Sequence, residues 1–259
     1  MQIAVPDAQL AVAVEGSGRP IVFVNGFGSY KEIWTAQVAA FSRRAQTVCF
    51  DYRGQGESTG AVATSLAALA NDLAAVLSQL QLKRPLLVGH SMGASVIWAF
   101  RQRHPDVPVS GVLVVDQSPK MLNDHQWQFG FRGLTARTAP VQLHRPRQGH
   151  ETLHGMVPAV MDAFIRAESR RPFDREQGVA LLADHFQADW RAQISNETAP
   201  VLFATAAQTP YFNNGYGQWL MRRNAQVREV MIQNCGHDVM AEVPEAFNQT
   251  LRHFMLQNK

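Results

Sequence analysis

One turn limits what this chain can fold into more than any other feature. Residues 86–88 are apolar (Leu-Leu-Val) and lead directly into Gly-His-Ser-Met-Gly at residues 89–93, and a helical stretch follows. A serine placed there lies on a sharp strand-to-helix turn, because the flanking glycines remove Cβ atoms for which the turn has no room. The turn exposes the Ser91 hydroxyl and places the backbone N–H of Met92 at a helix N-terminus, facing any oxygen that becomes negative nearby. The segment therefore predicts an α/β sheet that carries a candidate serine nucleophile.

Strand and helix patterns alternate along most of the chain. An antiparallel hairpin is expected over residues 1–15, and residues 65–81 have the strongest helical period, with leucine and valine recurring on one face. Short apolar runs predict strands at residues 21–24, 47–50, 111–115, 201–204 and 227–232, and residues 86–93 combine a strand with the serine turn. This alternation predicts an α/β fold with a mostly parallel central sheet and helices on both faces.

The alternation stops between residues 117 and 196. This stretch is rich in aromatic side chains: Trp127, Phe129, Phe131, Phe164, Phe173, Phe186 and Trp190. Aromatic side chains need a surface to bury against, so we interpret the stretch as a helical cap over the site rather than a plain surface excursion. The predicted organisation is a core of residues 1–116 and 197–259 with a cap insertion of residues 117–196.

Composition excludes several classes of partner. The net charge is only +3 and the basic residues are scattered, which disfavours nucleic acid. No run approaches the ~20 apolar residues of a membrane span.

Residues 1–7 lack the basic and apolar regions of a secretory signal, and two distant cysteines, Cys49 and Cys235, favour a reducing, cytoplasmic location. The histidines of residues 144–185 lack metal-ligand spacing, so we expect neither a metal nor another cofactor. The oligomeric state stays open.

A serine hydroxyl needs a base, and that base needs an orienting group. His237 follows the last predicted strand, in Gly-His-Asp at residues 236–238. Glycine-containing turns follow two earlier strands, Asn-Gly-Phe-Gly at residues 25–28 and Asp-Tyr-Arg-Gly-Gln-Gly-Glu-Ser at residues 51–58. The two glycine-containing turns, the serine turn and the Gly-His loop make four motifs. Four such motifs in this order resemble the sequences of the α/β-hydrolases. The resemblance covers almost the whole length and is closest to the small esterase, lactonase and haloperoxidase-like group.

The resemblance implies roles for four residues. Ser91 would be the nucleophile, His237 the base, and the backbone N–H groups of Phe27 and Met92 the oxyanion hole. The family usually has His-Gly where this chain has Asn25 followed by glycine. The N–H of Phe27 is unaffected by that change, since its role uses the backbone alone.

The second departure concerns the acid of the triad. The family usually carries an aspartate just after the strand that is here residues 201–204, but Thr209 stands in that place and no carboxylate lies nearby. Asp116, at the end of the preceding strand, is the alternative, because some members of the fold take their acid from that strand. The competing interpretation is that the Asp116 side chain caps the turn or helix that follows it. As the acid, Asp116 should lie within about 3.2 Å of His237 Nδ1.

These residues predict a serine hydrolase that cleaves a small carboxylic ester or lactone through an acyl-enzyme on Ser91. Asn25, Trp127 and Phe131 are the candidate pocket residues, and a small-molecule ester or lactone is the expected partner. A thioesterase or amidase would use the same groups. Two other classes stay open: a cofactor-independent oxygenase or perhydrolase-like enzyme, and a small-molecule receptor with low turnover.

Overall fold

An eight-stranded sheet forms the centre of the computed structural model, which describes residues 1–145 and 150–258. Its strand order is β1-β2-β4-β3-β5-β6-β7-β8. Strand β2 pairs antiparallel with both β1 and β4, and the six strands from β4 to β8 in this order run parallel to one another. The strands are β1 Gln2–Val5, β2 Ala8–Glu15, β3 Pro20–Val24, β4 Gln46–Phe50, β5 Leu86–His90, β6 Gly111–Val115, β7 Val201–Ala206 and β8 Val227–Ile232. This architecture confirms the predicted α/β class and the N-terminal hairpin.

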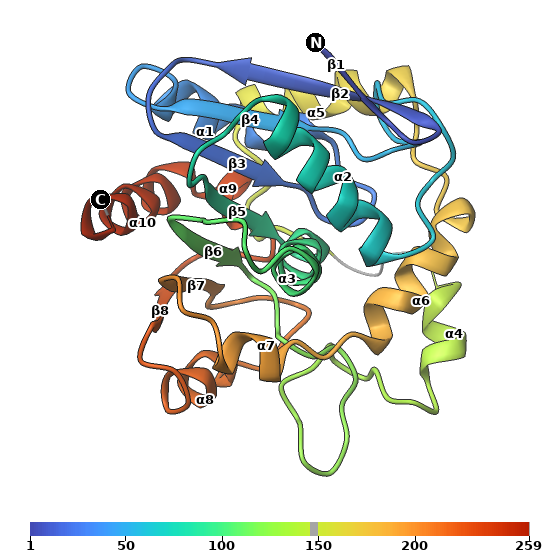
Figure 1. The fold of residues 1–259 in the computed structure, drawn as a ribbon. Coiled ribbons are helices and arrows are strands. Elements are labelled where there is room, and N and C mark those ends of the chain that lie inside the picture. The colour runs from blue at the N-terminus through green and yellow to red at the C-terminus, as the bar shows by residue number, and fades with distance from the viewer. Residues whose placement is uncertain (146–149, 259) are drawn as a thin grey trace.

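Helices cover both faces of the sheet because the parallel strands are apolar on both sides. Along β3, Val22 and Val24 pack into one core cluster, and the alternating Ile21 and Phe23 pack into the other. The helices of the core are η1 Lys31–Trp34, α1 Thr35–Phe41, α2 Leu66–Gln79, α3 Met92–Arg103, α8 Tyr216–Met221, α9 Val239–Glu242 and α10 Pro244–Gln257. Figure 1 shows α2 and α3 on the near face, and α1, α9 and α10 contribute to the cluster on the opposite face.

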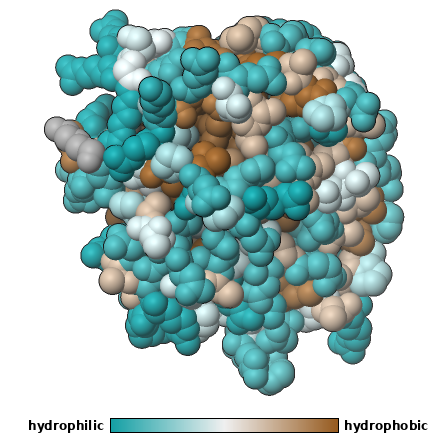
Figure 2. All heavy atoms as spheres, viewed as in Figure 1, coloured by the Kyte–Doolittle hydropathy of each residue, from teal (hydrophilic) through white to brown (hydrophobic). Residues whose placement is uncertain are grey.

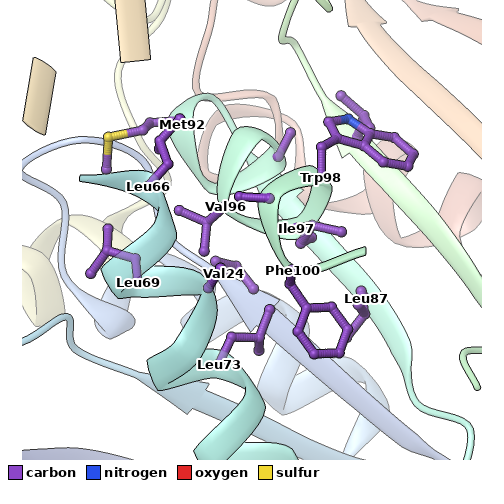
Figure 3. Packing of buried hydrophobic residues seen from close by; sticks show 14 of the residues in the cluster. Val24, Leu66, Leu69, Leu73, Leu87, Met92, Val96, Ile97, Trp98 and Phe100 are labelled. Carbon is purple, nitrogen blue, oxygen red and sulfur yellow. The ribbon is translucent and has the colours of Figure 1, made fainter. Parts of the chain in front are cut away.

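The helix before the serine strand forms as its period predicts. Ser65 Oγ caps α2 by accepting a hydrogen bond from the N–H of Ala68 at 3.2 Å. Leu66, Leu69 and Leu73 of α2 are buried in one core cluster with Val96, Ile97 and Phe100 of α3, which Figure 3 shows from close by. This packing fixes α3, and with it the turn at its N-terminus, against β3 and β5.

The predicted insertion contains helices and no strand of the sheet among its described residues; its residues 146–149 lie outside them. Its helices are α4 Ala139–Leu143, α5 Pro158–Arg170, η2 Glu176–Gly178, α6 Val179–Gln187 and α7 Arg191–Ser195. Figure 1 shows α4 and α6 together beyond the carboxyl ends of the central strands. The domain boundaries given above stay a prediction.

Hydrophilic side chains cover most of the face that carries α2 and α3, with apolar patches between them (Figure 2). In residues 1–145 and 150–258, none of the helices combines the length and the apolar character that crossing a membrane requires.

Candidate active site

Ser91 sits on a strained turn between β5 and α3. Its backbone has φ 52° and ψ −128°, a conformation that costs free energy for any residue with a side chain. The flanking glycines allow the close approach, since a Cβ on Gly89 would lie 2.7 Å from Ala94 N, and one on Gly93 would lie 2.3 Å from Val24 O. The backbone therefore holds the Ser91 side chain at the carboxyl edge of the sheet.

Asp116 and His237 meet at the same edge. Asp116 Oδ2 lies 2.7 Å from His237 Nδ1, within the distance expected from the sequence, and both side chains are buried. The other carboxylate oxygen, Oδ1, accepts a hydrogen bond from the N–H of Ala206 at 3.1 Å. Asp116 has φ 43°, in the left-handed region that aspartate tolerates better than most residues. Both oxygens are thus engaged, and the carboxylate has one orientation.

The imidazole of His237 lies near three acidic side chains. Burial by itself would lower the pKa of His237, but the hydrogen bond to Asp116 and the charges of Asp116, Glu151 and Asp238 outweigh it. The net result is a pKa above the ordinary value. An imidazole with a raised pKa is a stronger base toward a neighbouring hydroxyl.

A cavity of about 590 Å³ opens beside these residues, a size typical of small-molecule sites. Core residues that line it include Phe27, Ser91, Met92 and His237. Residues of the insertion line it too, among them Phe131, Phe164, Leu182, His185 and Phe186. The structure thus brings five of the predicted site residues, Phe27, Ser91, Met92, Phe131 and His237, to one cavity, with Asp116 directly behind His237.

Residues 19–244 match the family described as alpha/beta hydrolase fold. The chain belongs to this family. Among proteins similar in sequence, this α/β-hydrolase is 25% identical to 3-oxoadipate enol-lactonase 2 of Acinetobacter baylyi, over 96% of this chain and 94% of that protein. It is 21% identical to pimeloyl-[acyl-carrier protein] methyl ester esterase of Nitrosomonas europaea, over 93% and 97%.

Solved structures share the fold along the whole chain. An esterase from Exiguobacterium antarcticum superposes with a TM-score of 0.81 at 19% identity, covering 98% of each chain. Bromoperoxidase from Bacillus anthracis superposes with a TM-score of 0.84 at 16% identity, covering 98% of this α/β-hydrolase and 99% of that chain. At these identities the likeness concerns the fold alone.

The turn after β3 runs against the serine turn. A Cβ on Gly26 would lie 3.3 Å from Ser91 Cβ, so only a residue without a side chain fits between the two turns without displacing a neighbour. This contact places Phe27 beside Ser91, and the ring of Phe27 packs edge-on against Phe173 of the insertion at 5.1 Å. Phe27 and Met92 lie on these two turns, and both line the cavity that Ser91 also lines.

Sequence reasoning missed the aromatic residues packed on His237. The ring of Tyr211 lies edge-on to the imidazole, with 4.6 Å between centroids, and the Tyr211 hydroxyl donates to Glu151 Oε1 at 2.6 Å. Phe212 lies 6.2 Å from the same imidazole. The available signal was the position of Tyr211 and Phe212, in the loop after β7 where the family acid was expected.

The Asn25 side chain makes two hydrogen bonds within the core, and the pocket role expected for it stays a prediction. Its amide donates to Phe50 O at 3.0 Å, and its Oδ1 accepts from Trp34 Nε1 at 2.9 Å. The side chain is fully buried and is not part of the described cavity lining. Asn25 thus ties the turn after β3 to the neighbouring strand and to η1.

Trp127 packs among other aromatic rings, and its expected pocket role likewise stays a prediction. Its ring packs edge-on against Phe129 and Trp219, each at 5.2 Å, and its Nε1 donates to Lys120 O at 3.1 Å. Trp127 is buried and likewise absent from the lining among the described residues, whereas Phe131 belongs to it. The indole joins the insertion to α8.

A metal centre finds no support in residues 1–145 and 150–258, where no three histidine, cysteine or acidic side chains converge as ligands would. At this edge of the sheet, Ser91 offers a hydroxyl, His237 an imidazole and Asp116 a carboxylate.

Proposed function

We propose that this α/β-hydrolase is a serine hydrolase that cleaves a small carboxylic ester or lactone. The observation that carries the proposal is the 2.7 Å hydrogen bond between Asp116 and His237, beside a cavity that Ser91 also lines. A hydroxyl on a strained turn, an imidazole and an oriented carboxylate are the three groups that nucleophilic acyl transfer needs.

The proposed reaction starts from the hydrogen bond between Asp116 and His237. Asp116 accepts the Nδ1–H of His237, which leaves Nε2 free to take the hydroxyl proton as Ser91 Oγ attacks the substrate carbonyl. The backbone N–H groups of Phe27 and Met92 would stabilise the oxygen that becomes negative. His237 then returns the proton to the leaving alkoxide, and the alcohol departs from the acyl-enzyme. Water, deprotonated by His237, releases the acid and restores Ser91.

The choice of substrate class rests on the relatives and on the cavity walls. Two sequence relatives are named as an enol-lactonase and as a methyl ester esterase, and both align with this chain over nearly all of its length. The walls contributed by the insertion include Phe131, Phe164 and Leu182, which suit an apolar acyl or alcohol group. Phe131 stacks on Tyr211 at 4.9 Å, so the wall continues to His237.

The test is a panel of p-nitrophenyl esters of graded chain length, with lactones and thioesters beside them. The wild-type protein should hydrolyse esters or lactones, and Ser91→Ala should lower kcat by several orders of magnitude at an unchanged thermal midpoint. Ser95→Ala is the matched control, because Ser95 is buried one turn further along α3 and is outside the described cavity lining. Turnover by Ser91→Ala at the wild-type rate would remove Ser91 from the mechanism.

The same experiment separates the alternatives. An oxygenase would consume dissolved oxygen with a quinolone-type substrate and ignore the ester panel. A receptor would be stabilised against heat by its ligand without forming product. Either result, in the absence of ester or lactone turnover, would overturn the proposal.

A further inference from the structure

Glu242 is a buried carboxylate that the proposed mechanism does not use. It is the last residue of α9, the short helix that follows the His237 loop, and its side chain is 6% exposed. Its Oε2 accepts a hydrogen bond from the N–H of Gly236 at 2.7 Å, and Gly236 directly precedes His237 in the chain. One carboxylate oxygen therefore holds the backbone next to the candidate base.

The other carboxylate oxygen holds the insertion. Glu242 Oε1 accepts hydrogen bonds from the N–H of Leu153 at 2.7 Å and from the N–H of His154 at 2.6 Å. Hydrogen bonds from backbone N–H groups to a charged carboxylate are stronger than those to a neutral acceptor. Glu242 thus joins the insertion to the His237 loop through a single side chain.

The backbones of these two segments are also in direct contact. The N–H of Asp238 donates to Glu151 O at 3.2 Å, and a Cβ on Gly236 would lie 2.5 Å from the same oxygen, so only a glycine leaves room for the approach. The residues before and after His237 therefore both lie against residues 151–154 of the insertion. The insertion bears on the position of the base as well as on the wall of the cavity.

We propose that Glu242 is a positioning residue for His237, and that it acts by holding the His237 loop against residues 151–154 of the insertion. This inference rests on the proposed function, in which His237 takes the proton of Ser91. Glu242 is outside the described cavity lining, so it acts through the backbone of Gly236 and not on the substrate.

The contacts of the imidazole explain why its backbone needs holding. The hydrogen bond between Nδ1 and Asp116 orients one ring nitrogen, and the rings of Tyr211 and His90 pack on the imidazole, each with 4.6 Å between centroids. The distance from the base to Ser91 also depends on where the main chain of residue 237 stands. A misplacement of about 1 Å can lower a rate roughly 10²-fold, because proton transfer needs hydrogen-bond distance.

Glu242→Gln is the variant that tests the proposal, because glutamine has the shape of glutamate but one of its two ends donates. Two N–H groups donate to Oε1 and one to Oε2, so the amide oxygen should stay with Leu153 and His154. The NH₂ then faces the N–H of Gly236, and the repulsion between two donors displaces the loop. On the best ester, kcat should fall at least about tenfold while KM changes less than about threefold.

Two measurements separate a displaced base from a weakened fold. Proton NMR of the enzyme without substrate detects the proton between His237 Nδ1 and Asp116, whose resonance should shift in Glu242→Gln and disappear in Asp116→Asn. In the double variant of Glu242→Gln with Asp116→Asn, kcat should fall less than about threefold below that of Asp116→Asn alone, because His237 is already impaired there. Glu245→Gln is the matched control, since Glu245 is exposed in the first turn of α10, and it should change neither kcat nor the resonance.

Glu242→Asp is the second variant. It keeps the charge, but its carboxylate is one methylene shorter and should lose either Gly236 or the pair Leu153 and His154, so kcat should fall here too. An unshifted resonance or an unchanged kcat in Glu242→Gln, or an undiminished effect in the double variant, would each overturn the positioning role. If neither variant folds well below the thermal midpoint of the wild type, Glu242 serves stability alone and the inference is overturned as well. If the wild type turns over no ester or lactone, the proposed function fails, and the resonance still decides whether Glu242 holds His237, because that measurement needs no substrate.

Discussion

Replacing Asp116 by asparagine tests the proposed triad most directly. Asn has the same shape, but its two ends differ, and the buried N–H of Ala206 decides how it turns. That N–H donates to Asp116 Oδ1 at 3.1 Å, so the asparagine must keep its oxygen there and present its NH₂ to His237 Nδ1. His237 then has to accept at Nδ1 and carries its proton on Nε2, the nitrogen that should receive the proton of Ser91.

The magnitude follows from the two effects combined. In the productive tautomer His237 carries its proton on Nδ1, where it would face the NH₂ of the asparagine. Two donors facing each other in a buried site cost roughly 1–3 kcal/mol. The negative charge that stabilises the imidazolium in the transition state is also lost. Together we expect kcat to fall ~10⁴-fold, about 5.4 kcal/mol, as it does when serine triads lose the charge of their acid. The thermal midpoint should stay close to that of the wild type, because the shape and the bond to Ala206 are kept.

The assay is kcat on the best ester of the panel, measured well above the acid limb of the pH profile. Thr209→Ala is the control at the position where the family usually carries its acid. The Thr209 hydroxyl accepts a hydrogen bond from the N–H of Tyr211 at 3.3 Å and should matter little. An Asp116→Asn protein that keeps more than about a tenth of the wild-type kcat would refute the assignment of Asp116.

Three further outcomes are expected. A serine-directed phosphonate should label Ser91, and labelling elsewhere with Ser91 intact would count against the nucleophile. The base must be neutral to act, so the raised pKa of His237 predicts that kcat/KM falls with decreasing pH around a midpoint above 6.5; Asp116→Asn should move this midpoint to lower pH, and an unmoved midpoint would assign the limb to another group. Phe131→Ala should change the ranking of ester chain lengths, whereas Trp127→Ala should lower stability by about 3–5 kcal/mol and leave the ranking unchanged; the reverse pattern would contradict the placement of the two rings.

The fold was predictable because its strands have a local signature. Buried parallel strands need short apolar runs, and every run named from the sequence became a strand. The face of α2 was equally visible, since Leu66, Leu69 and Leu73 recur at helical spacing and all are buried. These features depend on neighbours in the sequence, which is why a single sequence is enough to find them.

The walls of the cavity were not predictable in the same way. Trp127 and Phe131 are both aromatic residues of one irregular loop, and nothing local distinguishes them. Trp127 turns toward Trp219, while Phe131 turns toward Tyr211 and the cavity. Which partner each ring meets depends on segments far away in the sequence; among the described residues Phe131 lines the cavity, and the pocket role of Trp127 stays a prediction. The partners of Asn25 were equally hard to predict, because its amide bonds to Phe50 and Trp34, which are distant in the sequence.

The position of the candidate acid follows from the sheet itself. β6 and β7 are adjacent parallel strands, so their carboxyl ends lie side by side, and a carboxylate at the end of either strand can reach the loop after β8. The N–H of Asp116 donates to Ala204 O at 3.0 Å, which ties the end of β6 to β7 at this edge. Because the candidate acid stands at the end of β6, the proposed mechanism needs no carboxylate in the loop after β7. Tyr211 of that loop packs edge-on against His237. The imidazole therefore contacts a carboxylate from the end of β6 and an aromatic ring from the loop after β7.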